Sequence, residues 1–180
     1  PPSLLETIVE SASNNSRRIL LEDVTGQGLT GRNLLVRTDL VARRLRGALF
    51  PDARHVGVLL PNVNATPVVI LSLMSLGRVP AILNFSTGPA LMLKCAELAG
   101  LRQIITSKDF VEKAKLDLQP LIDAGSEICW LDEIREELTV SEKALSMCRI
   151  VLSPRNVVRA PMKREDTAVI LFTSGSEGAP

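Results

Sequence analysis

The sequence predicts an α/β protein with a mostly parallel sheet and helices on both of its faces. Short apolar segments alternate with longer segments of helical period along the chain. The strand segments are apolar throughout, which is typical of parallel strands that are buried on both faces. The segment 65–76 reads as a nearly all-apolar helix, and such a helix must also be buried. Repeated βαβ units account for this pattern.

Local signals place the elements in chain order. A first helix begins at Leu4, and Thr30 is suited to cap a long helix that runs to about Leu49. Gly77 and Gly100 end two later helices, and Ser107 can cap the helix that follows it. The other elements expected are a turn at 25–28, helices at 65–76, 89–99, 116–124 and, in pieces, 132–152, and strands at 19–24, 55–60, 79–83, 102–106, 127–131 and 167–172.

Composition limits the class of protein. The 180 residues suit about one domain. We expect a first α/β subdomain at 1–152, a basic, proline-interrupted linker at 153–165, and a strand with the start of a loop at 166–180. Lys and Arg total 21 against 20 for Asp and Glu, and aromatic residues make up 3%, so nothing points to nucleic acid.

The cysteines, the histidine and one apolar run have ordinary interpretations. Three widely spaced cysteines in a chain without a signal peptide suggest a reduced, cytosolic protein. The single histidine, His55, is expected to be a satisfied strand residue and not a metal ligand. Residues 56–77 carry no charge, but Pro61 and Pro67 interrupt them, so we expect a strand, a turn and a helix in place of a membrane span.

Four arginines, Arg37, Arg43, Arg44 and Arg46, lie along the long helix expected after Thr30. A solvated helix face is the preferred interpretation, because positive charge suits the carboxyl end of a helix. An anion-binding patch is the alternative.

An apolar strand runs directly into a loop rich in serine and glycine at 173–180. Gly175 and Gly178 allow the backbone to approach a ligand closely, and successive backbone N–H groups can converge on an anion. Three hydroxyl groups add further donors, those of Thr173, Ser174 and Ser176. The spacing excludes a Walker A loop, a GxSxG nucleophile elbow and a GxGxxG turn. A phosphate chain is the expected ligand, and an ordinary Gly/Ser loop is the alternative.

The segment 172–180, Phe-Thr-Ser-Gly-Ser-Glu-Gly-Ala-Pro, resembles the phosphate-binding motif of the acyl-adenylate-forming superfamily. Segments 57–62, 76–81 and 98–106 are also similar to that family, so the resemblance covers nearly the whole chain. Glu177 stands where many members have threonine, and we expect its side chain to point away from the phosphates. The lysine and glycine that end the family motif would follow the last residue.

Three details resemble a narrower group, the synthetase half of the bacterial bifunctional acyl-ACP synthetase/2-acylglycerophosphoethanolamine acyltransferase. They are the stretch Leu-Asn-Phe-Ser-Thr-Gly at 83–88, the segment 106–110 followed by Lys113 and Lys115, and Glu177.

The resemblance implies an ATP- and Mg²⁺-dependent ligase that activates a fatty acid as acyl-AMP and transfers it to acyl carrier protein or CoA. In the narrower group the acyl chain would then reacylate a lysophospholipid, on the cytoplasmic side and peripherally at the bacterial inner membrane. The loop residues that would bind the β- and γ-phosphates are Thr173, Ser174, Gly175, Ser176 and Gly178. The family's catalytic and magnesium-binding residues would lie further along, so we expect no catalytic or metal residue in this segment and no adenylation by the isolated chain.

Two rival functions fit the same sequence. One is a different adenylating enzyme, such as a fatty-acyl-CoA or other carboxylic-acid–CoA ligase. The other is a non-catalytic α/β interaction module with an incidental Ser/Gly tail.

Overall fold

Strands and helices alternate along residues 2–160 and 162–173, which the computed structural model describes. The strands are β1 Ile19–Glu22, β2 Gly28–Thr30, β3 His55–Val58, β4 Val79–Ile82, β5 Gln103–Thr106, β6 Glu127–Trp130 and β7 Ile170–Leu171. The α-helices are α1 Leu4–Asn14, α2 Gly31–Ala48, α3 Ala65–Ser75, α4 Pro89–Ala99, α5 Lys108–Ala114, α6 Gln119–Asp123, α7 Leu131–Glu136 and α8 Val140–Leu152. Two 3₁₀ turns are η1 Phe85–Thr87 and η2 Pro154–Val157.

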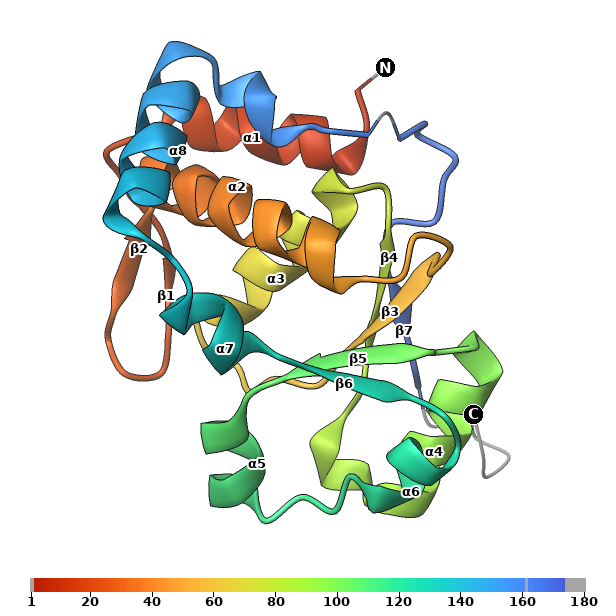
Figure 1. Cartoon of the computed structure of the whole chain (residues 1–180). Helices are drawn as coiled ribbons and strands as arrows, with labels where there is room; N and C mark the ends of the chain where they lie inside the picture. Colours follow the sequence, from red (N-terminus) through yellow and green to blue (C-terminus); the bar gives the residue numbers. More distant parts are fainter. Residues whose placement is uncertain (1, 161, 174–180) are drawn as a thin grey trace.

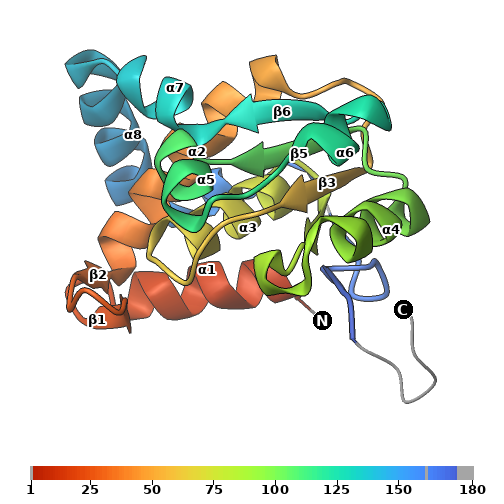
Figure 2. The ribbon, with the colours of Figure 1, turned by 90° about the horizontal axis from the view of Figure 1, so that it is seen from below.

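The predicted α/β fold is confirmed. One sheet has the strand order β6-β5-β3-β4-β7, and every neighbouring pair in it is parallel. Helices α1, α2, α3 and α8 lie on one side of this sheet, and α4 and α6 lie on the other (Figures 1 and 2). Strands β1 and β2 form a separate antiparallel ribbon beside α2.

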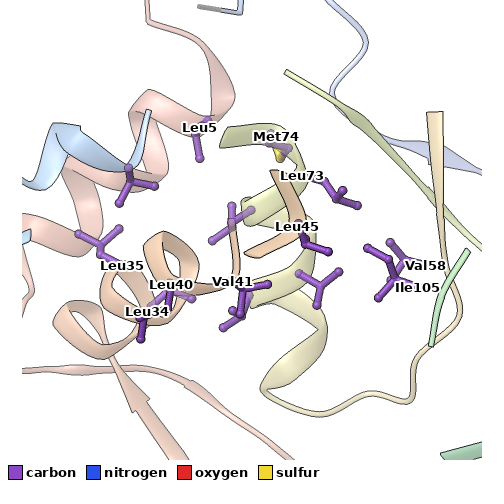
Figure 3. Close-up of a cluster of buried hydrophobic side chains, with 14 of the residues drawn as sticks. Leu5, Leu34, Leu35, Leu40, Val41, Leu45, Val58, Leu73, Met74 and Ile105 are labelled. Carbon is purple, nitrogen blue, oxygen red and sulfur yellow. The ribbon is translucent and has the colours of Figure 1, made fainter. Parts of the chain in front are cut away.

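Two clusters of buried side chains hold these layers together, one on each face of the sheet. In the first, Leu45 of α2 and Leu73 of α3 pack near Val58 and Ile105 of the sheet (Figure 3). In the second, α4 and α6 cover the opposite face, where Ile104 points. Neighbouring side chains of a strand point to opposite faces, so Ile104 and Ile105 are both 0% exposed although they belong to different clusters. This burial on both faces explains the uninterrupted apolar strands.

Hydroxyl side chains begin the helices where the sequence predicts them. Thr30 Oγ1 accepts a hydrogen bond from the backbone N–H of Asn33 at 3.3 Å, and Ser107 Oγ accepts one from Phe110 at 3.4 Å. Each bond satisfies one of the amide groups that the first turn of a helix leaves without a partner. Gly100 ends α4 in the left-handed region with φ of 62°, which a residue without a Cβ adopts at little cost.

The amino-terminal ribbon differs from the prediction. A strand was expected at 19–24 and a turn at 25–28, but β1 ends at Glu22 and β2 follows at Gly28–Thr30. The Asp23 carboxylate ends β1, because it accepts hydrogen bonds from the backbone of Thr25 and Gln27. Strand β2 buries only Leu29, and three residues are too short for a periodic signal.

The last strand is shorter than predicted. Residues 167–172 were expected to be one strand, but only Ile170–Leu171 pair with β4. Strand β7 has a neighbour on one side in the described chain, so apolar composition alone does not fix where its ladder starts and ends.

Part of the expected linker at 153–165 packs on the core. It contains η2, and Val157 is 0% exposed. Ser75 at the end of α3 donates from its hydroxyl to Val157 O, and Ser75 O accepts from the backbone N–H groups of Arg159 and Ala160 at 3.2 and 3.0 Å. The subdomain boundary stays a prediction, but residues 157–160 of the expected linker are bonded to the end of α3.

Candidate functional site

Strand β7 carries the chain to the carboxyl edge of the sheet, where the predicted phosphate loop begins. Its side chains Ile170 and Phe172 are half-buried against the second core cluster, and Thr173 is exposed at the end of the strand. The other predicted site residues, Ser174, Gly175, Ser176 and Gly178, lie outside the described residues, as does Glu177. The structure therefore describes the strand that delivers the loop and the first hydroxyl of the loop.

The loop after β4 and residue Thr173 both follow strands that end at the carboxyl edge of the sheet. Ile82 and Leu171 form the last residue pair of the β4–β7 ladder. Asn84 Oδ1 accepts hydrogen bonds from the backbone N–H and the hydroxyl of Ser86 at 3.0 and 2.8 Å, and Thr87 Oγ1 donates to Asn84 O at 2.8 Å. These bonds hold an exposed loop of hydroxyl and amide groups at the same edge.

This edge is also the place where the sheet changes winding direction. Strand β3 is followed by α3 on the first face, whereas β4 is followed by α4 on the opposite face. In open α/β sheets, ligands bind in the crevice that such a reversal leaves outside the carboxyl ends of the strands. Strand β7 lies directly beside β4, so Thr173 lies at the edge where this reversal occurs.

The turn after β3 has a structural role. The Asn64 side chain is buried and donates from Nδ2 to Gln27 O at 2.7 Å, and Thr66 Oγ1 donates to Pro61 O at 2.5 Å. The Asn64 bond attaches the turn to the β1–β2 ribbon, and the Thr66 bond lies within the turn. Both groups are therefore committed to protein partners.

Aromatic side chains cover the α4 side of the same edge. Phe85, in the loop after β4, meets Phe110 of α5 edge to face, with ring centroids 5.1 Å apart. Lys108 lies over the Trp130 ring at 5.8 Å and pairs with Glu133 Oε1 at 2.7 Å. The hydrogen bond that Lys108 donates to Glu133 raises the pKa of Lys108. The charge of Lys108 is therefore compensated by Glu133.

ATP phosphates suit the described groups at this edge. Thr173 presents an exposed hydroxyl, which can donate to a phosphate oxygen, whereas the Ser86 and Thr87 hydroxyls already donate within the β4 loop. Among the described residues, no group of three or more histidine, cysteine or acidic side chains could hold a metal ion. Thr173 could thus donate to a phosphate chain.

A buried charge cluster lies away from this edge, and sequence reasoning missed it. Asp39 of α2 is 0% exposed, and its carboxylate accepts from Ser146 Oγ at 2.6 Å and from the guanidinium of Arg159. Arg43 and Arg149 approach it at 3.8 and 4.0 Å. Burial lowers the pKa of Arg159, the Asp39 charge opposes that shift, and neighbouring arginines lower it further.

The arginine face of α2 was predicted to be solvated, and that prediction is wrong for two of its four members. Arg37 and Arg46 are exposed, but Arg43 and Arg44 are half-buried. Arg44 pairs with Glu137 at 3.1 Å and with Glu142 at 2.8 Å. Helix α8 covers this part of α2, so these arginines face protein. Asp39 is the single acidic residue of α2 and lies four positions before Arg43. This spacing was the signal in the sequence that the arginines of α2 have a protein partner.

The histidine, the cysteines and the apolar run have ordinary surroundings in the described chain. His55 Nδ1 lies 2.8 Å from Ala99 O, so this half-buried histidine has a backbone partner. Cys95, Cys129 and Cys148 are free thiols, and burial raises the pKa of Cys129 to about 11. The apolar run at 56–77 forms β3 and α3, as expected. Within the described ranges, no helix combines the length and the apolar character needed to cross a membrane.

Comparison with known proteins agrees with this geometry. The sequence profile of the family described as AMP-binding enzyme matches residues 8–180. The peroxisomal OPC-8:0-CoA ligase 1 of Arabidopsis thaliana is 30% identical over 181 residues, which span 98% of this chain and 32% of that protein. The chain therefore corresponds to about a third of that relative's length.

Solved structures share the fold. VinN in complex with 3-methylaspartate superposes with a TM-score of 0.71 at 22% identity, over 99% of this chain and 46% of VinN. The N-terminal subdomain of Klebsiella oxytoca NpsA gives a TM-score of 0.70 at 18% identity, over 99% of this chain and 41% of that one. The profile match covers most of the sequence and includes the loop that follows β7, so the chain belongs to the AMP-binding enzyme family.

Proposed function

We propose that the chain is the amino-terminal part of an AMP-forming acid–thiol ligase that activates a fatty acid. The observation that carries this proposal is the family match over residues 8–180, which includes the Ser/Gly motif that follows β7 in the sequence. The exposed hydroxyl of Thr173, just after β7, supports a phosphate site at the carboxyl edge of the sheet.

In the proposed reaction a carboxylate oxygen of the acid attacks the α-phosphorus of ATP, and the bond to pyrophosphate breaks. The thiol acceptor then attacks the acyl carbonyl, and AMP leaves. Thr173, Ser174, Gly175, Ser176 and Gly178 would donate hydroxyl and backbone hydrogen bonds to the β- and γ-phosphates. Pyrophosphate gains negative charge as it leaves, so these donors would stabilise the transition state more than bound ATP.

CoA is the acceptor that the relatives favour, since the Arabidopsis protein is a CoA ligase. Acyl carrier protein is the second candidate, and the sequence of the stretch 83–88 is what favours it. If acyl carrier protein is the acceptor, the full protein would reacylate a lysophospholipid and would lie peripherally at the bacterial inner membrane.

ATP–pyrophosphate exchange by the full-length protein tests the proposal. We expect exchange that depends on a long-chain fatty acid and on Mg²⁺, and that falls at least 100-fold when Ser174 and Ser176 are both replaced by alanine, because each lost donor costs about 10²–10³ at such sites. Ser141→Ala, on the exposed side of α8, is the matched control and should leave exchange unchanged. No exchange from folded protein would favour the non-catalytic module, and exchange that does not depend on the acid would contradict fatty-acid activation.

The same preparation distinguishes the two acceptors. Adding CoA or acyl carrier protein with its pantetheine arm, one at a time, should release AMP and form a thioester with only one of them. AMP release that occurs with CoA but not with acyl carrier protein would exclude the proposed reacylation of a lysophospholipid. AMP release that occurs with acyl carrier protein but not with CoA would support that proposal.

A further inference from the structure

A small hollow lies at the amino edge of the sheet, on the side opposite Thr173. It has a volume of about 120 Å³ and lies between the end of α2, the turn from α3 into β4, and residues 159 and 160. Leu49, Leu76 and Ala160 form its apolar part. Three arginines complete the lining, which are Arg46, Arg78 and Arg159.

Positive charge exceeds negative charge around this hollow. Within the described ranges, the ion pairs of this corner use two carboxylates, Asp39 and Asp52. Asp39 is shared among several guanidinium groups, and Asp52 pairs with Arg102 at 2.6 Å. The arginines of the corner are Arg43, Arg46, Arg78, Arg102, Arg149 and Arg159. Two carboxylates cannot neutralise this group.

The guanidinium groups are held in place by the protein. Arg78 Nη2 donates to Pro51 O at 2.7 Å, which fixes its side chain across the end of α2. Arg159 is 11% exposed and uses Nη2 for Asp39. Protein contacts therefore hold two of the three lining guanidinium groups in place.

We propose that the hollow binds one small oxyanion of the size and charge of inorganic phosphate. Its volume is well below the roughly 300 Å³ at which pockets begin to hold drug-sized ligands, so a nucleotide would not fit. A tetrahedral oxyanion offers several acceptors to converging guanidinium groups, which bind phosphate in forked geometry. The anion would join the end of α2, the start of β4 and the segment that leads to β7.

Equilibrium dialysis of the full-length protein against radiolabelled inorganic phosphate tests the site, at constant ionic strength with sodium chloride as the balancing salt. We expect Arg46→Gln to weaken phosphate binding about tenfold, the effect of losing one hydrogen bond to a charged group. Arg46 is exposed and should not be needed for folding. Arg37→Gln is the control, since Arg37 is exposed on the same helix and does not line the hollow.

A loop variant separates this site from the proposed ATP site. In the variant with alanine at 174 and 176, phosphate binding at the arginine hollow should persist with the same affinity. Loss of binding in that variant would place the phosphate at the loop and overturn the proposal. Equal affinities for Arg46→Gln and Arg37→Gln, or no measurable binding by the full-length protein, would also overturn it. Neither outcome would bear on ATP–pyrophosphate exchange, which tests the proposed function separately.

Discussion

Replacing Asp39 by asparagine should destabilise the chain far more than the same change at an exposed ion pair. Asp39 is fully buried and bonds Ser146 and Arg159, and the Arg159 side chain is 11% exposed. The substitution keeps the shape but removes the charge, and it leaves a guanidinium group buried without a counter-ion. Breaking a buried ion pair on one side costs about 3–5 kcal/mol, a large part of the roughly 5–15 kcal/mol that stabilises a domain.

The more distant arginines add little to this expected loss. Arg43 and Arg149 lie 3.8 and 4.0 Å from the Asp39 carboxylate and are about one-third exposed, so solvent screens them. The matched control is Asp52→Asn, because the Asp52–Arg102 pair is 71% and 56% exposed. Exposed pairs contribute about 0–1 kcal/mol, so the two variants should differ by at least 2 kcal/mol, the gap between these ranges.

Urea unfolding of the 180-residue chain measures the difference. Trp130 is the single tryptophan, so its fluorescence and far-UV circular dichroism give two probes, whose transitions should coincide. Adding Arg159→Met to Asp39→Asn should recover part of the loss, because both charges are then removed. A loss below about 1 kcal/mol for Asp39→Asn, or one equal to that of Asp52→Asn, would refute the assignment of a buried charge cluster.

The remaining predictions concern packing, pH, thiol reactivity and activity. Leu45→Ala should lower the free energy of unfolding by about 2–5 kcal/mol in urea, since Leu45 is 0% exposed, whereas Leu152→Ala, at an 85% exposed side chain, should change it by less than about 0.5 kcal/mol; similar losses would contradict the packing in Figure 3. The pKa of Glu142 is lowered from 4.5 to about 2 by the backbone amide of its cap residue and then by a neighbouring arginine, so its contribution is present above pH 4.5 and is lost as pH falls toward 2. Glu142→Gln should therefore flatten the fall in stability over that interval, measured by urea unfolding at several pH values, and an unchanged slope would contradict it. Cys148 is exposed and should react with Ellman's reagent at pH 8 before Cys129, whose pKa is about 11, and slower modification of the chain after Cys148→Ser is the check. The isolated chain should form no acyl-hydroxamate from fatty acid, ATP and hydroxylamine, and any product above that of the full-length loop variant would contradict this.

The central strands could be predicted because their apolar sequences match their buried positions in the sheet. Strands expected at 55–60 and 79–83 are found at His55–Val58 and Val79–Ile82. Both are buried on two faces, so an unbroken apolar run is what their positions require. Strand β7 is different, because its length is set by how many residues of β4 pair with it. The sequence of β7 alone does not contain that number.

The candidate site could be predicted only in part. The Ser/Gly loop is visible as a contiguous motif, but its neighbour at 84–88 becomes part of the same edge only through the pairing of Ile82 with Leu171. The charge cluster was beyond sequence reasoning for a similar reason. Ser146 and Arg159 lie 107 and 120 positions from Asp39, and periodicity does not relate residues at such distances.

The position of Thr173 depends on both edges of the sheet. Two residue pairs with β4 are a short ladder, and alone they would hold β7 weakly. A parallel strand must enter the sheet at its amino edge, and the chain is attached there at 157–160 by Ser75 and Asp39. Met162 and Ala168 then pack against the first core cluster on the way to β7. The attachment at the amino edge therefore sets the direction and register with which β7 delivers Thr173 to the opposite edge.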